Sequence, residues 1–114
     1  MPAHTSLDPV LLAELKDLLA DNFNELIERY TVDSAHRFSL LVTAVPEKDY
    51  KTIYYEAHGI KGSSRNMGAT KLAEICGQLE AQGHAEDGAG LENLLSEASA
   101  EFEVVCGILA GERT

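Results

Sequence analysis

Residues 57–69 read AHGIKGSSRNMGA, and this segment departs from the usual rules of the helix in which it lies. Two glycines, Gly59 and Gly62, and two serines stand close together inside a helical pattern. Each glycine inside a helix costs about 1 kcal/mol relative to alanine. Another interaction must offset that loss, and places where local rules are broken are candidates for function. His58 lies at the centre of the segment and is the first candidate functional residue.

The apolar residues of this helix predict which way His58 points. At 3.6 residues per turn, one face is shared by Ile53, Ala57, Ile60, Ser64 and Met67. We expect that face in the core, and His58 points about 140° away from it on an ideal wheel. The histidine should therefore stand at the surface. The residues within about 60° of it on the wheel are Lys51, Tyr54, Tyr55, Lys61, Gly62 and Arg65.

Several neighbours of His58 suit a reactive imidazole. Gly62, one turn later, places no side chain beside the ring, so a bulky partner could approach from that side. Lys61, at i+3, can bring its ammonium group to an anion carried by the imidazole. Ser64 permits close helix approach, and Gly68 can supply a left-handed turn after the helix. The sequence indicates no physical role for Gly59.

Charge is distributed unevenly along the 114 residues, whose formal net charge is −10. A nucleic-acid binder would need a basic footprint, and an anionic membrane surface would repel this chain. Five of the nine basic residues nevertheless lie within residues 47–71, namely Lys48, Lys51, Lys61, Arg65 and Lys71. A local cationic patch around one histidine suits a covalent phosphoryl group or an acidic partner surface.

Nothing in the sequence directs the chain into a membrane. No apolar run approaches the length that spans a bilayer, and residues 1–5 lack the charged and apolar regions of a signal peptide. Cys76 and Cys106 lie on apolar stripes and are too few for a disulfide framework or a zinc cluster, so we interpret them as reduced core residues. These features predict a cytoplasmic protein, and Met1 with a self-contained domain favours a stand-alone one.

Helical periodicity runs along the whole chain, and no repeat or linker interrupts it. We therefore expect one domain over residues 1–114, with residues 1–7 flexible. Asp8 and Pro9 predict the start of a short first helix. Longer helices are expected at residues 21–45, 47–66, 69–82 and 90–110, with a loop over residues 83–90.

The second of these helices has two weak points. Residues 31–34 are poor helix formers, so the helix could be broken there, and Pro46 should end it. No segment shows two-residue alternation or a hairpin turn. Long amphipathic helices with short connections pack as antiparallel neighbours. The predicted fold is all-α: an antiparallel four-helix bundle with an additional short N-terminal capping helix.

The residues alone leave the role of His58 open. A lone histidine on a helix is usually a solvated side chain, and we interpret His4, His36 and His84 in that way. Glycine and serine can serve close packing, and lysines can form an ordinary solvated face. At His58 the glycine, the cations and the outward direction coincide, which favours a function without establishing it.

The segment from Ala57 to Ala69 resembles the signature of histidine-containing phosphotransfer (HPt) domains, the carriers of multistep two-component phosphorelays. The family pattern is a histidine, two residues, Lys-Gly, two small residues and a Gly-Ala turn. It is matched by His58, Lys61, Gly62, Ser63, Ser64, Gly68 and Ala69. The helical plan along nearly the whole chain is similar too, including the capping first helix.

The resemblance implies roles for the site residues. His58 would accept a phosphoryl group on a ring nitrogen from a phospho-aspartate in the receiver domain of a hybrid histidine kinase. It would then pass the group to the receiver of a response regulator. Lys61 would stabilise the phosphoryl group, and Gly62 would clear space for the receiver. The implied partner-binding residues are Tyr54, Tyr55, Lys61, Gly62 and Arg65.

The resemblance also implies a carrier rather than an enzyme. The partner receiver would supply Mg²⁺, an acidic cluster and its own lysine, so no cofactor or metal site is expected on this chain. We expect a monomer that binds neither nucleic acid nor membrane. A neutral imidazole nucleophile suits the reaction near pH 7, because the ordinary pKa of histidine is about 6.5.

Glu80 is a departure from the pattern. Some family members place a glutamine on the fourth helix facing the histidine, and Glu80 stands at the matching position. A carboxylate there could accept a hydrogen bond from the imidazole and fix its tautomer, but it would repel a phosphoryl group placed too near. We expect Glu80 to point to solvent instead.

Three other functions compete with phosphotransfer. An inert helical adaptor would bind a receiver without being phosphorylated, but such a protein would not need His58. A histidine kinase or phosphatase would need a nucleotide loop, whereas Lys61-Gly62-Ser63 is not Gly-Lys-Ser/Thr, and 114 residues leave no room for an ATPase domain. A metal-binding bundle would need Glu-x-x-His pairs, and Glu56 precedes His58 by only two residues.

Overall fold

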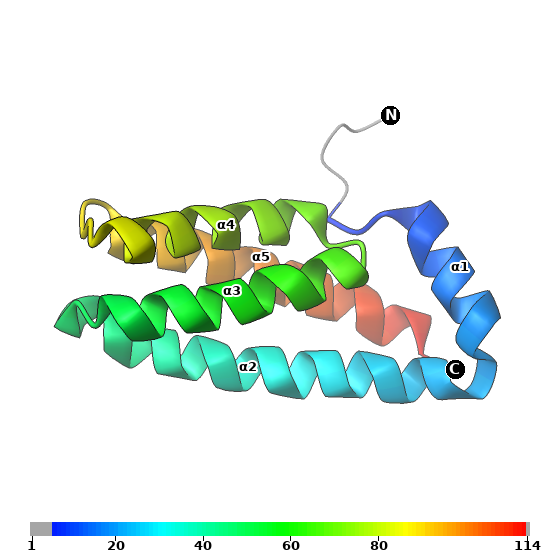
Figure 1. The fold of residues 1–114 in the computed structure, drawn as a ribbon. Coiled ribbons are helices and arrows are strands. Elements are labelled where there is room, and N and C mark those ends of the chain that lie inside the picture. The colour runs from blue at the N-terminus through cyan, green and yellow to red at the C-terminus, as the bar shows by residue number, and fades with distance from the viewer. Residues whose placement is uncertain (1–5, 114) are drawn as a thin grey trace.

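The computed structural model describes residues 6–113 as an all-helical bundle (Figure 1). Four helices run alternately in opposite directions, and they are α2 (Phe23–Glu47), α3 (Tyr50–Asn66), α4 (Thr70–Ala85) and α5 (Leu91–Glu112). The short helix α1 (Pro9–Leu19) lies across one end of the bundle and is joined to α2 by a 3-10 turn, η1 (Ala20–Asn22). The predicted four-helix bundle with a capping helix is confirmed.

The capping helix is fixed to the bundle through its first residues. The side chain of Asp8 accepts hydrogen bonds from two backbone amides at 2.9 and 3.2 Å, and Pro9 is the first helical residue, as predicted. The amide of Asp8 donates to the carbonyl of Gly68 at 2.9 Å, which ties α1 to the turn between α3 and α4. Of the segment expected to be flexible, residues 1–5 lie outside the described residues, and Leu7 is buried in the core.

Helix α2 is continuous through residues 31–34, where the sequence allowed a break. The hydroxyl of Thr31 donates to the carbonyl of Ile27 at 2.8 Å, one turn earlier. Ser34 is buried against the rest of the bundle. Tertiary packing therefore overrides the weak helix propensity of this segment.

The prediction that Pro46 ends α2 is wrong. Pro46 lies inside the last turn, and the helix ends after Glu47 with Lys48 in a left-handed conformation at φ 55°. A proline this close to the end removes one helical hydrogen bond, and the buried Val45 holds the turn against the core. At its other end α2 begins at Phe23, because residues 20–22 form the 3-10 turn.

The other helix boundaries differ from the predictions for local reasons. Helix α3 begins later than residue 47, because the carboxylate of Asp49 caps it by accepting from the amide and the hydroxyl of Thr52. Helix α4 passes through Gly83, the predicted start of a loop, and ends at Ala85. A Cβ atom at Gly83 would lie 2.9 Å from the amide nitrogen of Tyr54, so this glycine lets α4 pack closely on α3.

The predicted core face of α3 is confirmed. Its members are exposed by 2% or less, and they are Ile53, Ala57, Ile60, Ser64 and Met67. Ser64 shares a 2.8 Å hydrogen bond with the hydroxyl of Tyr30 on α2, so the one polar side chain of this face has a partner in the core. Gly68 has φ +81°, the left-handed turn expected of it. Cys76 is buried and Cys106 is partly buried, and both are free thiols.

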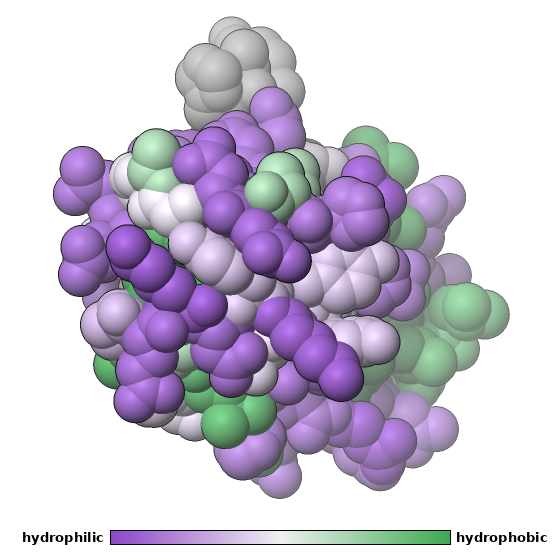
Figure 2. Space-filling view, turned by 60° about the vertical axis from the view of Figure 1, so that its left-hand side comes forward, coloured by the Kyte–Doolittle hydropathy of each residue, from purple (hydrophilic) through white to green (hydrophobic). Residues whose placement is uncertain are grey.

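Hydrophilic residues cover most of the face shown in Figure 2, and hydrophobic residues appear on it in separate places. The large hydrophobic side chains that are exposed come from several helices, and they are Val10, Leu18, Val32, Leu40, Val42, Tyr55, Val104 and Ile108. Within residues 6–113, no helix combines the length and the apolar character needed to cross a membrane.

Candidate functional site

Helix α3 presents His58 to solvent, as the wheel predicts. The side chain is 59% exposed, while its neighbour Ala57 is fully buried. Tyr54, one turn earlier, lies nearly parallel to the imidazole, with ring centroids 6.1 Å apart and planes inclined by 14°. The ring of His58 is therefore restrained by a neighbour on its own helix while much of it stays accessible.

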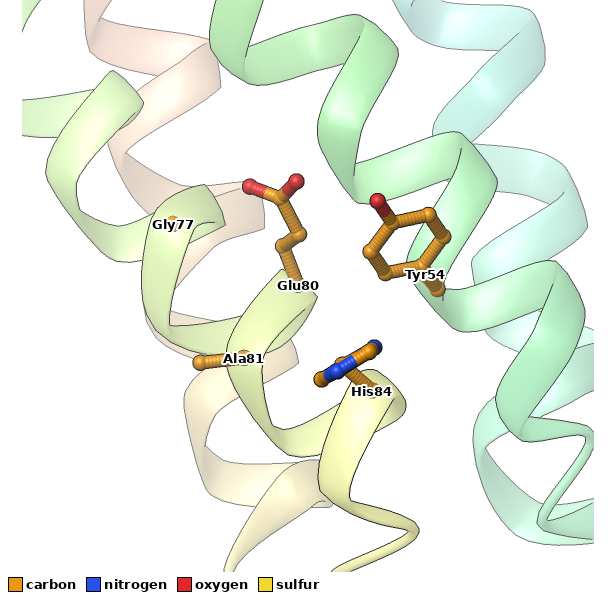
Figure 3. Close-up of a pocket in the computed structure, with 5 residues that line it drawn as sticks. All are labelled: Tyr54, Gly77, Glu80, Ala81 and His84. Carbon is orange, nitrogen blue, oxygen red and sulfur yellow. The ribbon is translucent and has the colours of Figure 1, made fainter.

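Glu80 reaches His58 from α4, and the expectation that it points to solvent is wrong. Its Oε2 lies 2.7 Å from Nδ1 of His58, and its Oε1 is paired with the ammonium group of Lys61. Only 14% of the Glu80 side chain is exposed. Figure 3 shows its carboxylate in the space between α4 and α3, on the side toward Tyr54. Two donors on α3 hold the carboxylate inward, because charged hydrogen bonds compensate for its partial loss of water.

The charge on Glu80 determines which ring nitrogen of His58 is free. Burial acts to raise the pKa of the Glu80 carboxyl, but hydrogen bonds from Lys61 and His58 outweigh it and hold that pKa below its usual range. Glu80 is therefore a carboxylate near neutral pH and can only accept hydrogen bonds. In the neutral imidazole Nδ1 must then carry the proton, which leaves the lone pair of Nε2 available as a nucleophile.

Gly62 leaves the surface open one turn after His58. Apart from its two chain neighbours and the nearby backbone of its own helix, no described atom lies within 4 Å of the position that a Cβ atom of Gly62 would take. Tyr55 and Arg65 are exposed on the same helix, Tyr54 is half-buried, and Lys61 is held by Glu80. The predicted site residues are thus gathered along about three turns of α3, with Lys61 turned toward α4.

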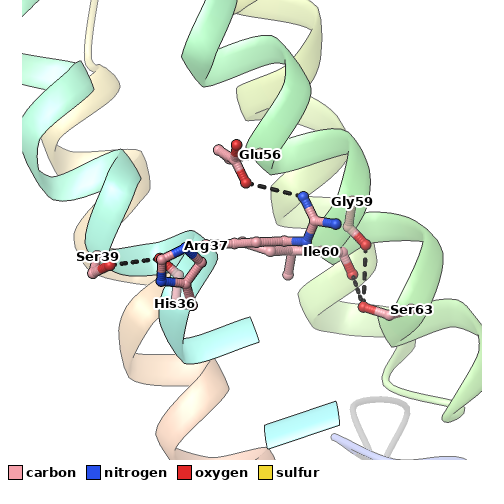
Figure 4. Close-up of polar contacts among 7 residues, drawn as sticks. All are labelled: His36, Arg37, Ser39, Glu56, Gly59, Ile60 and Ser63. Carbon is pink, nitrogen blue, oxygen red and sulfur yellow. Dashed lines mark hydrogen bonds and ion pairs between the residues drawn. The ribbon is translucent and has the colours of Figure 1, made fainter. Parts of the chain in front are cut away.

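Gly59 has a structural role that the sequence did not reveal. Arg37 on α2 lays its guanidinium group over Gly59, as Figure 4 shows. A Cβ atom at Gly59 would lie 2.5, 2.6 and 2.7 Å from Cζ, Nη1 and Nε of Arg37. Nη1 of Arg37 also donates to Oε1 of Glu56 at 2.9 Å. An ion pair therefore lies on each side of His58: Lys61–Glu80 toward α4 and Arg37–Glu56 toward α2.

Sequence reasoning missed Arg37, whereas it considered Glu80 as a partner of His58 but expected that side chain to point to solvent. For Glu80 a signal existed, because it stands where some HPt domains have a glutamine, and only its orientation was misjudged. For Arg37 no local signal existed, since its contact with Gly59 joins two helices. Of the other histidines, His36 and His84 are exposed and His4 lies outside the described residues.

A metal-binding bundle finds no support in the described part of the chain. Within residues 6–113, no group of three or more His, Cys, Asp or Glu side chains is arranged to hold a metal ion. The acidic residue nearest the candidate nucleophile, Glu80, is occupied by Lys61 and His58. The chemistry available at this site is that of an exposed nitrogen nucleophile supported by a carboxylate and an ammonium group.

Comparisons with known proteins agree with this geometry. A family model described as "Hpt domain" matches residues 25–103. Among solved structures, the chain is similar to the crystal structure of histidine-containing phosphotransfer protein B (HptB) from Pseudomonas aeruginosa PAO1. The TM-score is 0.91, the sequences are 29% identical, and the match covers 96% of each chain. No curated protein sequence matches significantly.

Proposed function

Because the chain belongs to the Hpt domain family, whose members carry phosphoryl groups on histidine in two-component phosphorelays, we propose that His58 is the phospho-acceptor. The donor is a phospho-aspartate in the receiver domain of a hybrid histidine kinase, and the recipient is the receiver of a response regulator. One observation supports this most: the hydrogen bond from Nδ1 of His58 to Glu80 leaves Nε2 as a free nucleophile on an exposed ring.

The transfer step balances without a further reactant. The lone pair of Nε2 attacks the phosphorus atom, in line with the bond to the aspartate oxygen. The N–P bond forms as the P–O bond breaks, and the aspartate leaves as a carboxylate with the bonding electron pair. The ring keeps its proton on Nδ1 and becomes a phospho-imidazolium. The same step in reverse passes the group to the second receiver.

Glu80 and Lys61 act on charge during this step. As Nε2 forms its new bond, positive charge develops on the ring, and the Glu80 carboxylate stabilises it through the Nδ1 hydrogen bond. Lys61 neutralises much of the charge on Glu80, which limits repulsion between that carboxylate and the phosphoryl oxygens. The two residues together allow an anion to approach a histidine that already has a carboxylate partner.

The chain acts as a carrier in this scheme, and the receiver supplies the Mg²⁺ and the groups that activate the phospho-aspartate. Gly62 leaves room for the receiver to approach Nε2. Tyr54, Tyr55 and Arg65 line the surface over which it docks. The chain's own contribution is a correctly protonated, exposed and electrostatically supported nitrogen atom.

The test is phosphotransfer with a panel of receiver domains, each labelled with radioactive acetyl phosphate in the presence of Mg²⁺. We expect at least one receiver to label the chain, and a second unlabelled receiver to remove that label. A receiver that binds the chain while no receiver in the panel labels it would mean that the protein is a non-phosphorylated adaptor.

A further inference from the structure

We infer that Arg37 is a docking residue: its guanidinium, seated on Gly59 beside the phospho-acceptor, pairs with a carboxylate on the receiver and helps to select that receiver. The inference rests on the proposed function, since it requires a receiver to cover His58. It gives a functional purpose to the contact between Arg37 and Gly59, a residue for which the sequence alone indicated no role.

The guanidinium group is held in place before any partner arrives. Arg37 crosses from α2 to α3, where Glu56 accepts a 2.9 Å hydrogen bond from Nη1 and the backbone of Gly59 lies underneath (Figure 4). That bond uses one of the five N–H donors of an arginine. The side chain is still 40% exposed. A cation that is already ordered loses little further side-chain entropy when it pairs with a partner.

Gly59 is the residue that makes this seat. Glycine weakens a helix interior relative to alanine, so its presence at residue 59 needs a compensating use. An alanine there would place its Cβ atom within 2.7 Å of three guanidinium atoms and would push the group off the helix. The displaced atoms are the end of a flexible side chain, so the fold would tolerate the change. The change would instead move the guanidinium group away from its place beside His58.

The surroundings of Arg37 suit a protein partner that presents an acidic group. A shallow groove between α2 and α3 is lined by Val32, Asp33, His36, Arg37, Leu40 and Glu56. Val32 and Leu40 are exposed apolar side chains, which a docked surface would remove from water. Excluding water around the guanidinium strengthens its attraction to a carboxylate. Asp33 and Glu56 are acidic and would repel a carboxylate placed elsewhere in the groove.

Three variants separate docking from a purely structural role. Arg37→Met removes the cation and keeps most of the apolar stem, Glu56→Gln removes the internal competitor for the guanidinium, and Gly59→Ala displaces it. Arg113→Met is the control, because Arg113, the residue that follows α5, is similarly exposed, at 44%, and pairs with Glu28 of α2. The probe is a receiver that labels the wild-type chain, and both its Kd for the unphosphorylated chain and its transfer rate at saturation are measured.

At low salt we expect Arg37→Met to raise the Kd about three- to tenfold, with a smaller increase for Gly59→Ala and a lower Kd for Glu56→Gln. The difference between Arg37→Met and wild type should shrink at high salt, and the saturated transfer rate should not change. Arg113→Met should bind as wild type does. Arg37→Lys, which keeps the charge and loses the planar fork, should lie between wild type and Arg37→Met.

Two results would overturn the inference while leaving the proposed function intact. One is an Arg37→Met chain that is labelled by the receiver and binds it with the wild-type Kd at low salt. The other is an equal rise in Kd for Arg37→Met and Glu56→Gln with equally lowered melting temperatures, which would mean that the ion pair only stabilises the bundle. Failure of every receiver to label or bind the wild-type chain would instead refute the proposed function, and this inference with it.

Discussion

Replacing Glu80 with glutamine tests how the carboxylate supports phosphotransfer. With its single amide oxygen accepting from Nδ1 of His58, the new side chain keeps the tautomer, but it loses the charge and no longer accepts from Lys61. Hydrogen bonds to charged groups contribute about 1.5–3 kcal/mol, and neutral ones about 0.5–1.5 kcal/mol. Because His58 is 59% exposed, solvent screening favours the low end of that difference, about 1 kcal/mol. Transfer to His58 should therefore slow roughly fivefold.

Glu80→Ala should have a larger effect, because it removes the acceptor as well as the charge. The imidazole proton is then free to move to Nε2, and molecules in that tautomer cannot attack phosphorus. The matched control is Glu74→Gln, which removes one exposed carboxylate from the same helix. Rapid-quench transfer from a saturating phosphorylated receiver gives the rates, and nitrogen-15 NMR of the imidazole gives the position of the proton.

Phosphotransfer should be fastest for wild type and Glu74→Gln, slower for Glu80→Gln and slowest for Glu80→Ala. The NMR spectrum of neutral His58 should place the proton on Nδ1 in wild type. Equal rates in all four proteins, or a wild-type ring protonated on Nε2, would refute the reasoning about this hydrogen bond.

Three further predictions concern stability and access. The folded state lowers the pKa of the Glu80 carboxyl. The stability that this carboxylate contributes is therefore present above the ordinary carboxyl range and is lost as pH falls through the lowered folded value. In urea unfolding, the difference in stability between wild type and Glu80→Gln should shrink as pH falls below that range. Gly62→Gln should gain up to about 1 kcal/mol of stability, since its site is open, while its phosphotransfer is hindered; unchanged transfer would exclude a steric role for this glycine. Gly83→Ala should lose about 1–3 kcal/mol of stability, because its Cβ atom would lie 2.9 Å from the amide nitrogen of Tyr54. Gly107→Ala, on the open surface of α5, should not lose stability. Thermal melts compare the two variants, and equal melting temperatures would contradict this packing argument.

The parts of the fold that follow local rules were predictable from the sequence. The start of α1 depends on two adjacent residues. Asp8 accepts hydrogen bonds from backbone amides of the first turn, and the fixed φ of Pro9 suits the first helical position. The buried face of α3 follows from a 3.6-residue period, and the exposure of His58 follows from the same wheel. The turn at Gly68 needs a left-handed residue, and glycine is the residue that adopts it without strain.

The parts that depend on contacts between helices were not predictable. Residues 31–34 stay helical because Ser34 is packed in the core, and Gly83 stays in α4 because it touches α3. Glu80 turns inward because two donors on another helix meet it there. Arg37 of α2 lies on Gly59 of α3, so this contact also depends on how two helices pack against each other. A single sequence does not specify which side chains of neighbouring helices come to lie opposite one another.

The most direct test of the central claim is the transfer of label from a phosphorylated receiver to wild type, to His58→Gln and to His84→Gln. His84 is an exposed histidine on α4 and serves as the control. We predict label on wild type and on His84→Gln, held by a bond that is labile in acid and stable in alkali, as a phosphoramidate is. His58→Gln should carry no label. Labelling of His58→Gln at the wild-type level would contradict the account.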